Sequence, residues 1–284
     1  FLYLSPERLQ SSFIQEKIAQ LTINLIAIDE AHCISEWGHD FRPSYRNIKV
    51  LRELKPSAPI IALTATATKE VLNDIASSLE IENAIVYKKS FYRDNLAYQV
   101  FIIEDKLGRL LQICKKTKAP IIIYVSSRNK TKEVATFLNA NNFKASYYHG
   151  GLSSNNKQEA FDRWISEKTP IIVATNAFGM GIDKDNVKVV VHLDLPNSIE
   201  NYIQEAGRAG RNGEKAFSAV LAHKNDTRLF KERIQNTFPS IKEIKHLYKS
   251  LSLNFQIAKG EFIEKAYDFN LTMFSNTYKI AENK

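Results

Sequence analysis

The sequence contains only two cysteines, Cys33 and Cys114, among its 284 residues. Two thiols cannot build a disulfide framework or a four-cysteine zinc site, so we expect a cytoplasmic protein without zinc. The sequence also lacks an apolar run of roughly 20 residues, and it shows no basic and apolar signal segment, so we expect no membrane partner. Because it begins at Phe1 rather than at methionine, we expect a chain cut from a longer one.

What the sequence does contain is typical of a globular protein with real cores, with 44% hydrophobic and 25% charged residues. Its net charge of +8 is unevenly spread along the chain. Residues 1–100 carry 11 basic and 12 acidic side chains, whereas residues 201–284 carry 14 and 9. We therefore expect the later part of the chain to attract a polyanion more strongly than the first part, although a solvated lysine-rich surface would give the same count.

Short β-branched apolar runs alternate with amphipathic stretches throughout the first 222 residues. The runs are continuous rather than alternating, which is typical of parallel strands covered on both faces. We predict helices over 69–79 and 154–165, and strands over 23–28, 59–63, 84–87, 121–125, 145–148, 171–174 and 187–193. Alternating strands and helices predict an α/β fold.

The pattern falls into two α/β blocks, residues 1–90 and 105–222, joined by a polar and aromatic linker over 91–104. Residues 223–284 change character. A helical stripe of apolar residues over 241–251 is followed by a segment rich in phenylalanine and tyrosine. We predict a small, mostly helical appendage for this tail.

The first strand runs directly into Asp29, Glu30, Ala31 and His32. Carboxylates at the carboxyl end of a buried parallel strand lie where α/β sheets bind ligands. Asp29 could hold Mg²⁺ through water, and Glu30 could orient and deprotonate an attacking water, as nucleotide hydrolysis requires. The alternative is an acidic helix N-terminus that the helix dipole favours.

Two further segments of the first block carry side chains suited to relaying a signal. Thr64 and Thr66 follow the strand over 59–63 and could hydrogen-bond a neighbouring carboxylate or histidine. Trp37, Phe41 and Arg42 lie on a loop around a glycine and a proline, and such aromatic and cationic groups suit stacking on unpaired bases. The alternative for the threonine segment is a cap on the following helix. The alternative for the aromatic loop is that its side chains simply pack into the hydrophobic core.

In the second block, Thr175 and a Gly-x-Gly pair ending at Gly181 follow a strand, and Asp183 comes next. Thr175 could hold a backbone phosphate, and Asp183 could accept a hydrogen bond from a ribose hydroxyl. The segment 204–211 then places Arg208 and Arg211 three residues apart, which we expect to lie on one helix face. Planar guanidinium groups suit the γ-phosphate whose charge develops during hydrolysis. A basic surface patch is the alternative.

Together these segments resemble the RecQ family of superfamily 2 DNA helicases. The run from Asp29 to Pro43 is similar to motif II joined to the aromatic-rich loop of that family and is the most specific match. The other similar stretches are 3–9 (motif Ib), 124–127 and 148–152 (around motif IV), 178–184 (motif V) and 204–211 (motif VI).

The resemblance implies two RecA-like domains, the first over 1–90 with motifs Ib to III and the second over 105–222 with motifs IV to VI. It implies ATP and Mg²⁺ as cofactors and movement in the 3′-to-5′ direction along single-stranded DNA, with unwinding of partly duplex DNA in repair or recombination. A bacterial member would lie at the nucleoid. The resemblance implies catalytic roles for Asp29, Glu30, His32, Arg208 and Arg211, and ATP binding by Gly181, Asp183 and Gln204. It implies that DNA binding is coupled to hydrolysis by Thr64, Thr66, Trp37, Phe41 and Arg42. It implies DNA binding by Trp37, Phe41, Arg42, Ser127, Arg128, His149 and Thr175.

The sequence departs from the family pattern in two respects. It contains no Gly-x-x-x-x-Gly-Lys-Ser/Thr, so we expect the phosphate-binding loop before Phe1, an incomplete first domain and no ATP hydrolysis by these residues alone. Residues 223–284 contain no cysteine, so the zinc module common in the family is absent or replaced. The open alternatives are a non-catalytic DNA-binding fragment and a DEAH-type RNA helicase.

Overall fold

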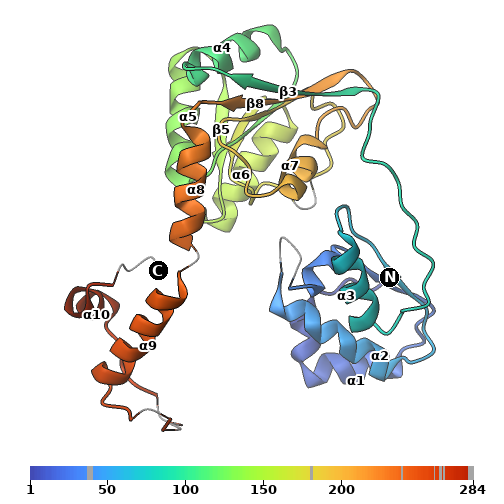
Figure 1. The fold of residues 1–284 in the computed structure, drawn as a ribbon. Helices are drawn as coiled ribbons and strands as arrows, with labels where there is room; N and C mark the ends of the chain where they lie inside the picture. The colour runs from blue at the N-terminus through green and yellow to red at the C-terminus, as the bar shows by residue number, and fades with distance from the viewer. Residues whose placement is uncertain are drawn as a thin grey trace. The chain divides into compact units, whose positions relative to one another are not determined.

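The computed structural model describes residues 1–36, 41–179, 182–237, 239–258, 260–261, 264 and 266–280 (Figure 1). The chain divides into two compact units. One comprises residues 1–101 and 105–221, and the other comprises 102–104 and 222–284. Within the described residues, none of the helices combines the length and the apolar character that crossing a bilayer demands.

The first part of the chain is built around two parallel strands, β1 (Ile26–Ile28) and β2 (Ile60–Ala62), with Ile28 opposite Ala62. Ile26 and Ile28 pack with Ile18, Val71 and Ile75 in one apolar core. The Thr68 side chain caps the helix after β2 by accepting a hydrogen bond from Val71 N. The surrounding helices are η1 (Pro6–Gln10), α1 (Ser12–Gln20), η2 (Ala31–Ile34), η3 (Pro43–Lys49), α2 (Val50–Leu54) and α3 (Lys69–Ser78).

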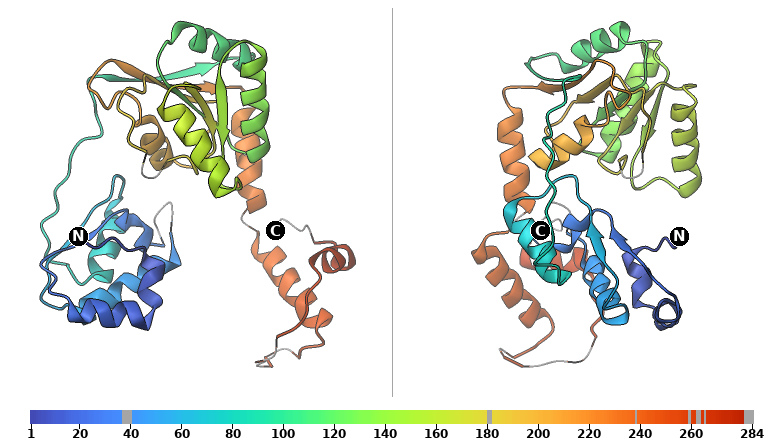
Figure 2. Two further views of the ribbon diagram at one scale, coloured as in Figure 1. Left: turned by 180° about the vertical axis from the view of Figure 1, so that it is seen from behind. Right: turned by 90° about the vertical axis from the view of Figure 1, so that its right-hand side faces the viewer.

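A six-stranded sheet in the order β3-β8-β7-β4-β6-β5 forms the second part (Figure 2). Its strands are β3 (Leu96–Ile102), β4 (Ile121–Tyr124), β5 (Ala145–Tyr148), β6 (Ile171–Ala174), β7 (Val189–His192) and β8 (Ala216–Ala222). The strands from β8 to β5 pair in parallel, so their carboxyl ends share one edge of the sheet. The chain order reverses between β4 and β7, and such a switch point is where open α/β sheets bind ligands.

Helices α4 (Lys106–Lys116), α5 (Arg128–Ala140), α6 (Ser154–Ile165) and α7 (Ile199–Ala206) lie between these strands in the chain. Serine side chains cap three of them, at Ser127, Ser153 and Ser198. Trp164 of α6 is fully buried and packs edge-on against Phe178, 5.2 Å between ring centroids. The caps and this aromatic pair fix the loops that follow β4, β5 and β6.

The tail contains helices α8 (Asp226–Thr237), α9 (Ile241–Asn254) and α10 (Leu271–Tyr278). Helix α9 begins at a capping box, in which Ser240 and Glu243 exchange hydrogen bonds. Aromatic rings join the segments beyond α9: Phe255 contacts Tyr267 and Phe269, and Phe269 contacts Phe274 of α10. The predicted helical appendage is thus confirmed.

The α/β class is confirmed, but three strand assignments need correction. The segment 84–87 forms no strand, because Ile85, Val86 and Tyr87 are exposed without a neighbouring strand to pair with. Residues 96–102, expected in the linker, form β3 at a sheet edge. Strand β8 was not predicted, because its alanine-rich sequence has low intrinsic strand preference and gains its place by burial.

Candidate active site

Asp29 and Glu30 lie immediately after β1, at the carboxyl end of the parallel pair. Asp29 is exposed, and its Oδ1 accepts a hydrogen bond from Glu30 N at 2.9 Å. Glu30 is half-buried and has φ +49°, a left-handed conformation that few residues other than glycine adopt. Such backbone strain at an acidic residue beside a sheet edge is typical of a functional position.

A buried histidine joins the ends of the two strands. His32 is 2% exposed, and its Nδ1 lies 2.9 Å from Thr64 Oγ1 and 3.4 Å from Glu30 Oε2. Thr64 Oγ1 also donates to Thr66 O at 3.2 Å. Five of the residues predicted from the sequence therefore lie in one connected cluster, in which Thr64 contacts the histidine as expected.

The donor chemistry at this edge suits Mg²⁺ held by few protein ligands. Asp29 offers a hard carboxylate oxygen, the ligand type that Mg²⁺ prefers. Among the described residues there is no group of three or more histidine, cysteine, aspartate or glutamate side chains that could enclose a metal ion. Asp29 would thus hold Mg²⁺ mainly through water and nucleotide oxygens, and the ion would neutralise phosphate charge.

The two arginines of the 204–211 segment lie beyond the end of α7, not on it. The helix ends at Ala206, and Gly207 and Gly210 lie in the turn that follows, with Gly210 at φ +67°. The expectation of one helix face was therefore wrong, because glycine stops the helix before either arginine. We refer to residues 207–213 as the arginine turn.

Both arginines contact the loop after β6. Arg208 Nη1 donates to Gly179 O at 2.6 Å, and a side chain at Gly179 would place its Cβ 2.8 Å from Arg208 Nη2. Arg211 Nη1 donates to Ile182 O at 2.9 Å and to Asp183 Oδ1 at 2.7 Å. The structure therefore brings Asp183 to Arg211, whereas Gly181 lies outside the described residues. Gln204 contacts the first block, because its Nε2 donates to Thr66 Oγ1 at 3.3 Å.

A buried contact between a histidine and a glutamate, close to the arginine turn in the chain, was not predicted from the sequence. His192 ends β7 with no exposed surface, and its Nε2 lies 2.9 Å from Oε2 of Glu205 on α7. The His192 ring stacks on Tyr124, whose hydroxyl donates to Phe178 O at 2.8 Å. The only sequence signal was a histidine at the end of an apolar strand. Such a histidine is more often a buried, hydrogen-bonded core residue than a functional one. This pair fixes α7 three residues before Arg208.

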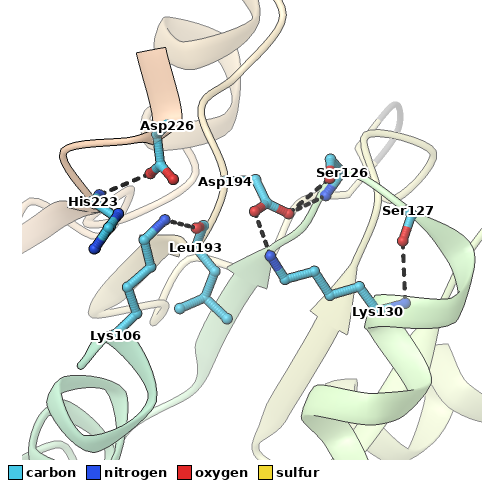
Figure 3. A network of polar contacts seen from close by, with 8 residues as sticks. All are labelled: Lys106, Ser126, Ser127, Lys130, Leu193, Asp194, His223 and Asp226. Carbon is cyan, nitrogen blue, oxygen red and sulfur yellow. Dashed lines mark hydrogen bonds and ion pairs between the residues drawn. The ribbon is translucent and has the colours of Figure 1, made fainter. Parts of the chain in front are cut away.

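The carboxyl ends of β4 and β7 are joined by Asp194 (Figure 3). One of its oxygens accepts hydrogen bonds from Ser126 N and Oγ, both at 2.8 Å, and the other pairs with Lys130. Burial raises the pKa of Asp194, but the hydrogen bonds from Lys130 and Ser126 outweigh it and hold the pKa below its usual value. Asp194 thus anchors the predicted DNA-binding segment at Ser127, which caps α5 through Lys130 N.

Basic and aromatic side chains surround the loops after β4 and β5. The Arg128 side chain lies against Gly151, where an added Cβ would be 2.9 Å from Nη1. His149 stacks on Tyr147, with 6.0 Å between ring centroids. Desolvation and the charges of Arg128 and Lys157 lower the pKa of His149. Thr175 lies on the adjacent loop, where its N donates to Tyr148 O at 3.2 Å.

The predicted coupling loop is only partly described. Trp37 lies outside the described residues, whereas Phe41 is half-buried beneath Arg46, 5.1 Å from the guanidinium to the ring centroid. Arg42 N donates to Cys33 O at 3.0 Å, which ties the loop to η2 beside His32. A short backbone path therefore connects Arg42 to the carboxylate cluster.

Known proteins share both halves of this arrangement. A DEAD/DEAH box helicase family matches residues 1–75, and a helicase conserved C-terminal domain family matches residues 104–213. The probable ATP-dependent DNA helicase RecS of Bacillus subtilis is 41% identical over 255 residues, which cover 88% of this chain and 51% of that protein. The ATP-dependent DNA helicase RecQ of the same organism is 42% identical over 226 residues, covering 79% of this chain and 38% of that protein.

Solved structures agree on the fold. Saccharomyces cerevisiae Dbp5 bound to RNA and ADP BeF3 has a TM-score of 0.61 and 21% identity, covering 78% of this chain and 59% of that one. The two family matches place the chain in the class of superfamily 2 helicases. Within that class, the chain belongs to the RecQ family, and it spans about half or less of the length of these curated relatives.

Arg128 begins α5, and a helix N-terminus is suited to phosphate oxygens. Replacing Arg128 by alanine is therefore expected to weaken single-stranded DNA binding equally for all sequences, since phosphate contacts carry no sequence information. The slope of log affinity against log salt concentration should fall in magnitude by about 0.7 for each lost phosphate contact. Fluorescence anisotropy titrations at several salt concentrations measure both. Arg163→Ala removes an exposed arginine paired with Glu159 and serves as the control. An unchanged salt slope for Arg128→Ala would place the contact elsewhere.

Replacing Arg42 by alanine in the full-length gene product is expected to keep the melting temperature and the basal ATPase rate but to lose stimulation by single-stranded DNA. The alanine keeps the backbone hydrogen bond from Arg42 N to Cys33 O, so the loop stays tied to η2, whereas the guanidinium group expected to contact DNA is lost. Arg46→Ala, which uncovers the Phe41 ring, tests whether packing of the loop matters instead. A collapse of the melting temperature with normal stimulation of the folded fraction would make Arg42 a structural residue.

Proposed function

We propose that the full-length gene product is an ATP-dependent DNA helicase of the cytoplasm, moving 3′ to 5′ along single-stranded DNA and unwinding duplexes in repair or recombination. One observation carries the proposal: the strained Glu30, with Asp29 and the His32–Thr64 contact, lies at the carboxyl end of a parallel pair in a chain that also presents two arginines. The names of the RecS and RecQ relatives, both DNA helicases, support it.

In this proposal each residue acts through its own atoms. Glu30 takes a proton from the attacking water, and His32, itself in contact with Thr64, holds the Glu30 carboxylate in place. Arg208 and Arg211 neutralise charge that grows on the γ-phosphate. Gly181, Asp183 and Gln204 contact the nucleotide, and Thr66 relays its state.

The second block would bind the DNA backbone. Three of the predicted residues lie on the loops after β4, β5 and β6 along one sheet edge, namely Ser127, His149 and Thr175, and Arg128 begins α5. Arginine, hydroxyl groups and the N-terminus of α5 are all suited to phosphate oxygens. The coupling loop would contact bases through Trp37, Phe41 and Arg42. A change in the loop on DNA binding would then be transmitted to the carboxylate cluster.

Strand displacement by the full-length gene product tests the proposal. Labelled duplexes with a 3′ or a 5′ single-stranded tail, the tail being DNA or RNA, are mixed with enzyme with and without ATP. ATP-dependent separation of the 3′-tailed DNA substrate is the expected result. Preference for an RNA tail would support the RNA helicase alternative. Binding of DNA with neither unwinding nor ATP hydrolysis would instead support a non-catalytic module.

A further inference from the structure

The segment between the two blocks contacts the arginine turn directly. Arg93, three residues before β3, reaches across to the turn with both terminal nitrogens. Its Nη1 donates to Gly207 O at 3.0 Å, and its Nη2 donates to Gly210 O. These two carbonyls bracket Arg208, so one guanidinium holds both sides of the residue that we expect to meet the nucleotide.

Asn95 reinforces the same contact. The Asn95 side-chain Nδ2 donates to Gly210 O at 2.7 Å and to Glu214 O at 2.9 Å. The backbone carbonyl of Asn95 accepts a hydrogen bond from Ala216 N at 2.8 Å. Gly210 has φ +67°, and a Cβ there would lie 2.7 Å from Asn95 Nδ2. The glycine is thus required both by the backbone conformation and by the close approach of Asn95.

Elementary helix chemistry explains why an arginine suits this place. The last carbonyls of a helix lack intrahelical partners, and the helix dipole makes that end negative. Gly207 is the C-cap of α7, so a cation at its carbonyl is stabilised by both effects. A guanidinium can bridge two carbonyls with fixed geometry, whereas a lysine ammonium is a single point charge.

We propose that Arg93, supported by Asn95, is a positioning residue that sets the arginine turn for catalysis. Since Arg93 belongs to the segment leading from the first block, a displacement of that segment would shift the turn carrying Arg208. The inference rests on the proposed ATP hydrolysis. The rival account is that Arg93 only caps α7 and stabilises the fold.

The test compares Arg93→Ala and Arg93→Lys in the full-length gene product, with Lys88→Ala as the control for an exposed cation just before that segment. Steady-state kcat and KM for ATP, the melting temperature and single-stranded DNA affinity are measured. We expect both Arg93 variants to lose about 100-fold in kcat, the scale of a small misplacement of a catalytic group. KM, DNA affinity and the Arg93→Lys melting temperature should stay near wild type.

A double-mutant cycle separates positioning from stability. Because Arg93 acts through Arg208 in this account, adding Arg93→Ala to Arg208→Ala should cause little further loss of kcat. Additive losses accompanied by a lower melting temperature would show a capping role only. Normal kcat in both Arg93 variants would overturn the inference and leave the proposed function intact. Absence of hydrolysis by the wild-type protein would overturn both.

Discussion

Replacing Arg208 by alanine in the full-length gene product is expected to lower kcat for ATP hydrolysis by about 10³- to 10⁵-fold, the usual effect of removing an arginine finger. Charge on the γ-phosphate grows only in the transition state, so ATP affinity should change little. Arg211→Ala is expected to act in the same direction. Arg211 also pairs with Asp183, whose side chain is 86% exposed. Losing this exposed ion pair in Arg211→Ala should therefore leave the fold intact.

Single-turnover hydrolysis and binding of a fluorescent ATP analogue measure the two quantities separately. Arg163→Ala provides a matched control, because it removes an exposed arginine on α6 that lies outside the site. If Arg208→Ala retained near-normal kcat, its contact with Gly179 would be structural, and the arginine turn would have another role such as DNA contact.

Replacing Glu30 by glutamine should be comparably severe, with a loss of about 10²- to 10⁴-fold in hydrolysis. The amide keeps the shape of the side chain but cannot take a proton from water. ATP and DNA binding should persist, because Asp29 and the arginines are unchanged. Glu36→Gln is the control, since Glu36 is an exposed acid a few residues away that pairs with Arg46.

Two readouts decide this prediction. Hydrolysis by Glu30→Gln near the wild-type rate would show that another group activates the water. A large fall in melting temperature would instead indicate that Glu30, whose backbone is already strained, mainly holds His32 in place.

Local sequence pattern predicted the α/β class and the acidic cluster because these features are local or strongly periodic. The strand that ends just before Asp29 and the threonine cap of α3 depend on neighbouring residues, so both could be predicted from the local sequence. The sequence predicted that Thr64 could hydrogen-bond a neighbouring carboxylate or histidine, and the structure shows that the partner is His32. Single-residue roles within the site stay predictions.

Features that depend on distant pairing were missed. Strand β3 is formed by pairing beside β8 from far along the chain, and neither segment shows this in its own sequence. Arg93 contacts carbonyls 114 and 117 residues away, and backbone acceptors have no sequence signature. The same holds for the buried pair of His192 and Glu205, which requires β7 and α7 to be packed before it exists.

ATP hydrolysis by the full-length gene product, measured with and without single-stranded DNA, decides whether the carboxylate cluster and the arginine turn serve a DNA-dependent ATPase. We expect hydrolysis that rises with DNA and falls by about 10²- to 10⁴-fold in the Glu30→Gln variant. Equal rates with and without DNA, or no hydrolysis by a folded wild-type protein that binds DNA, would contradict it.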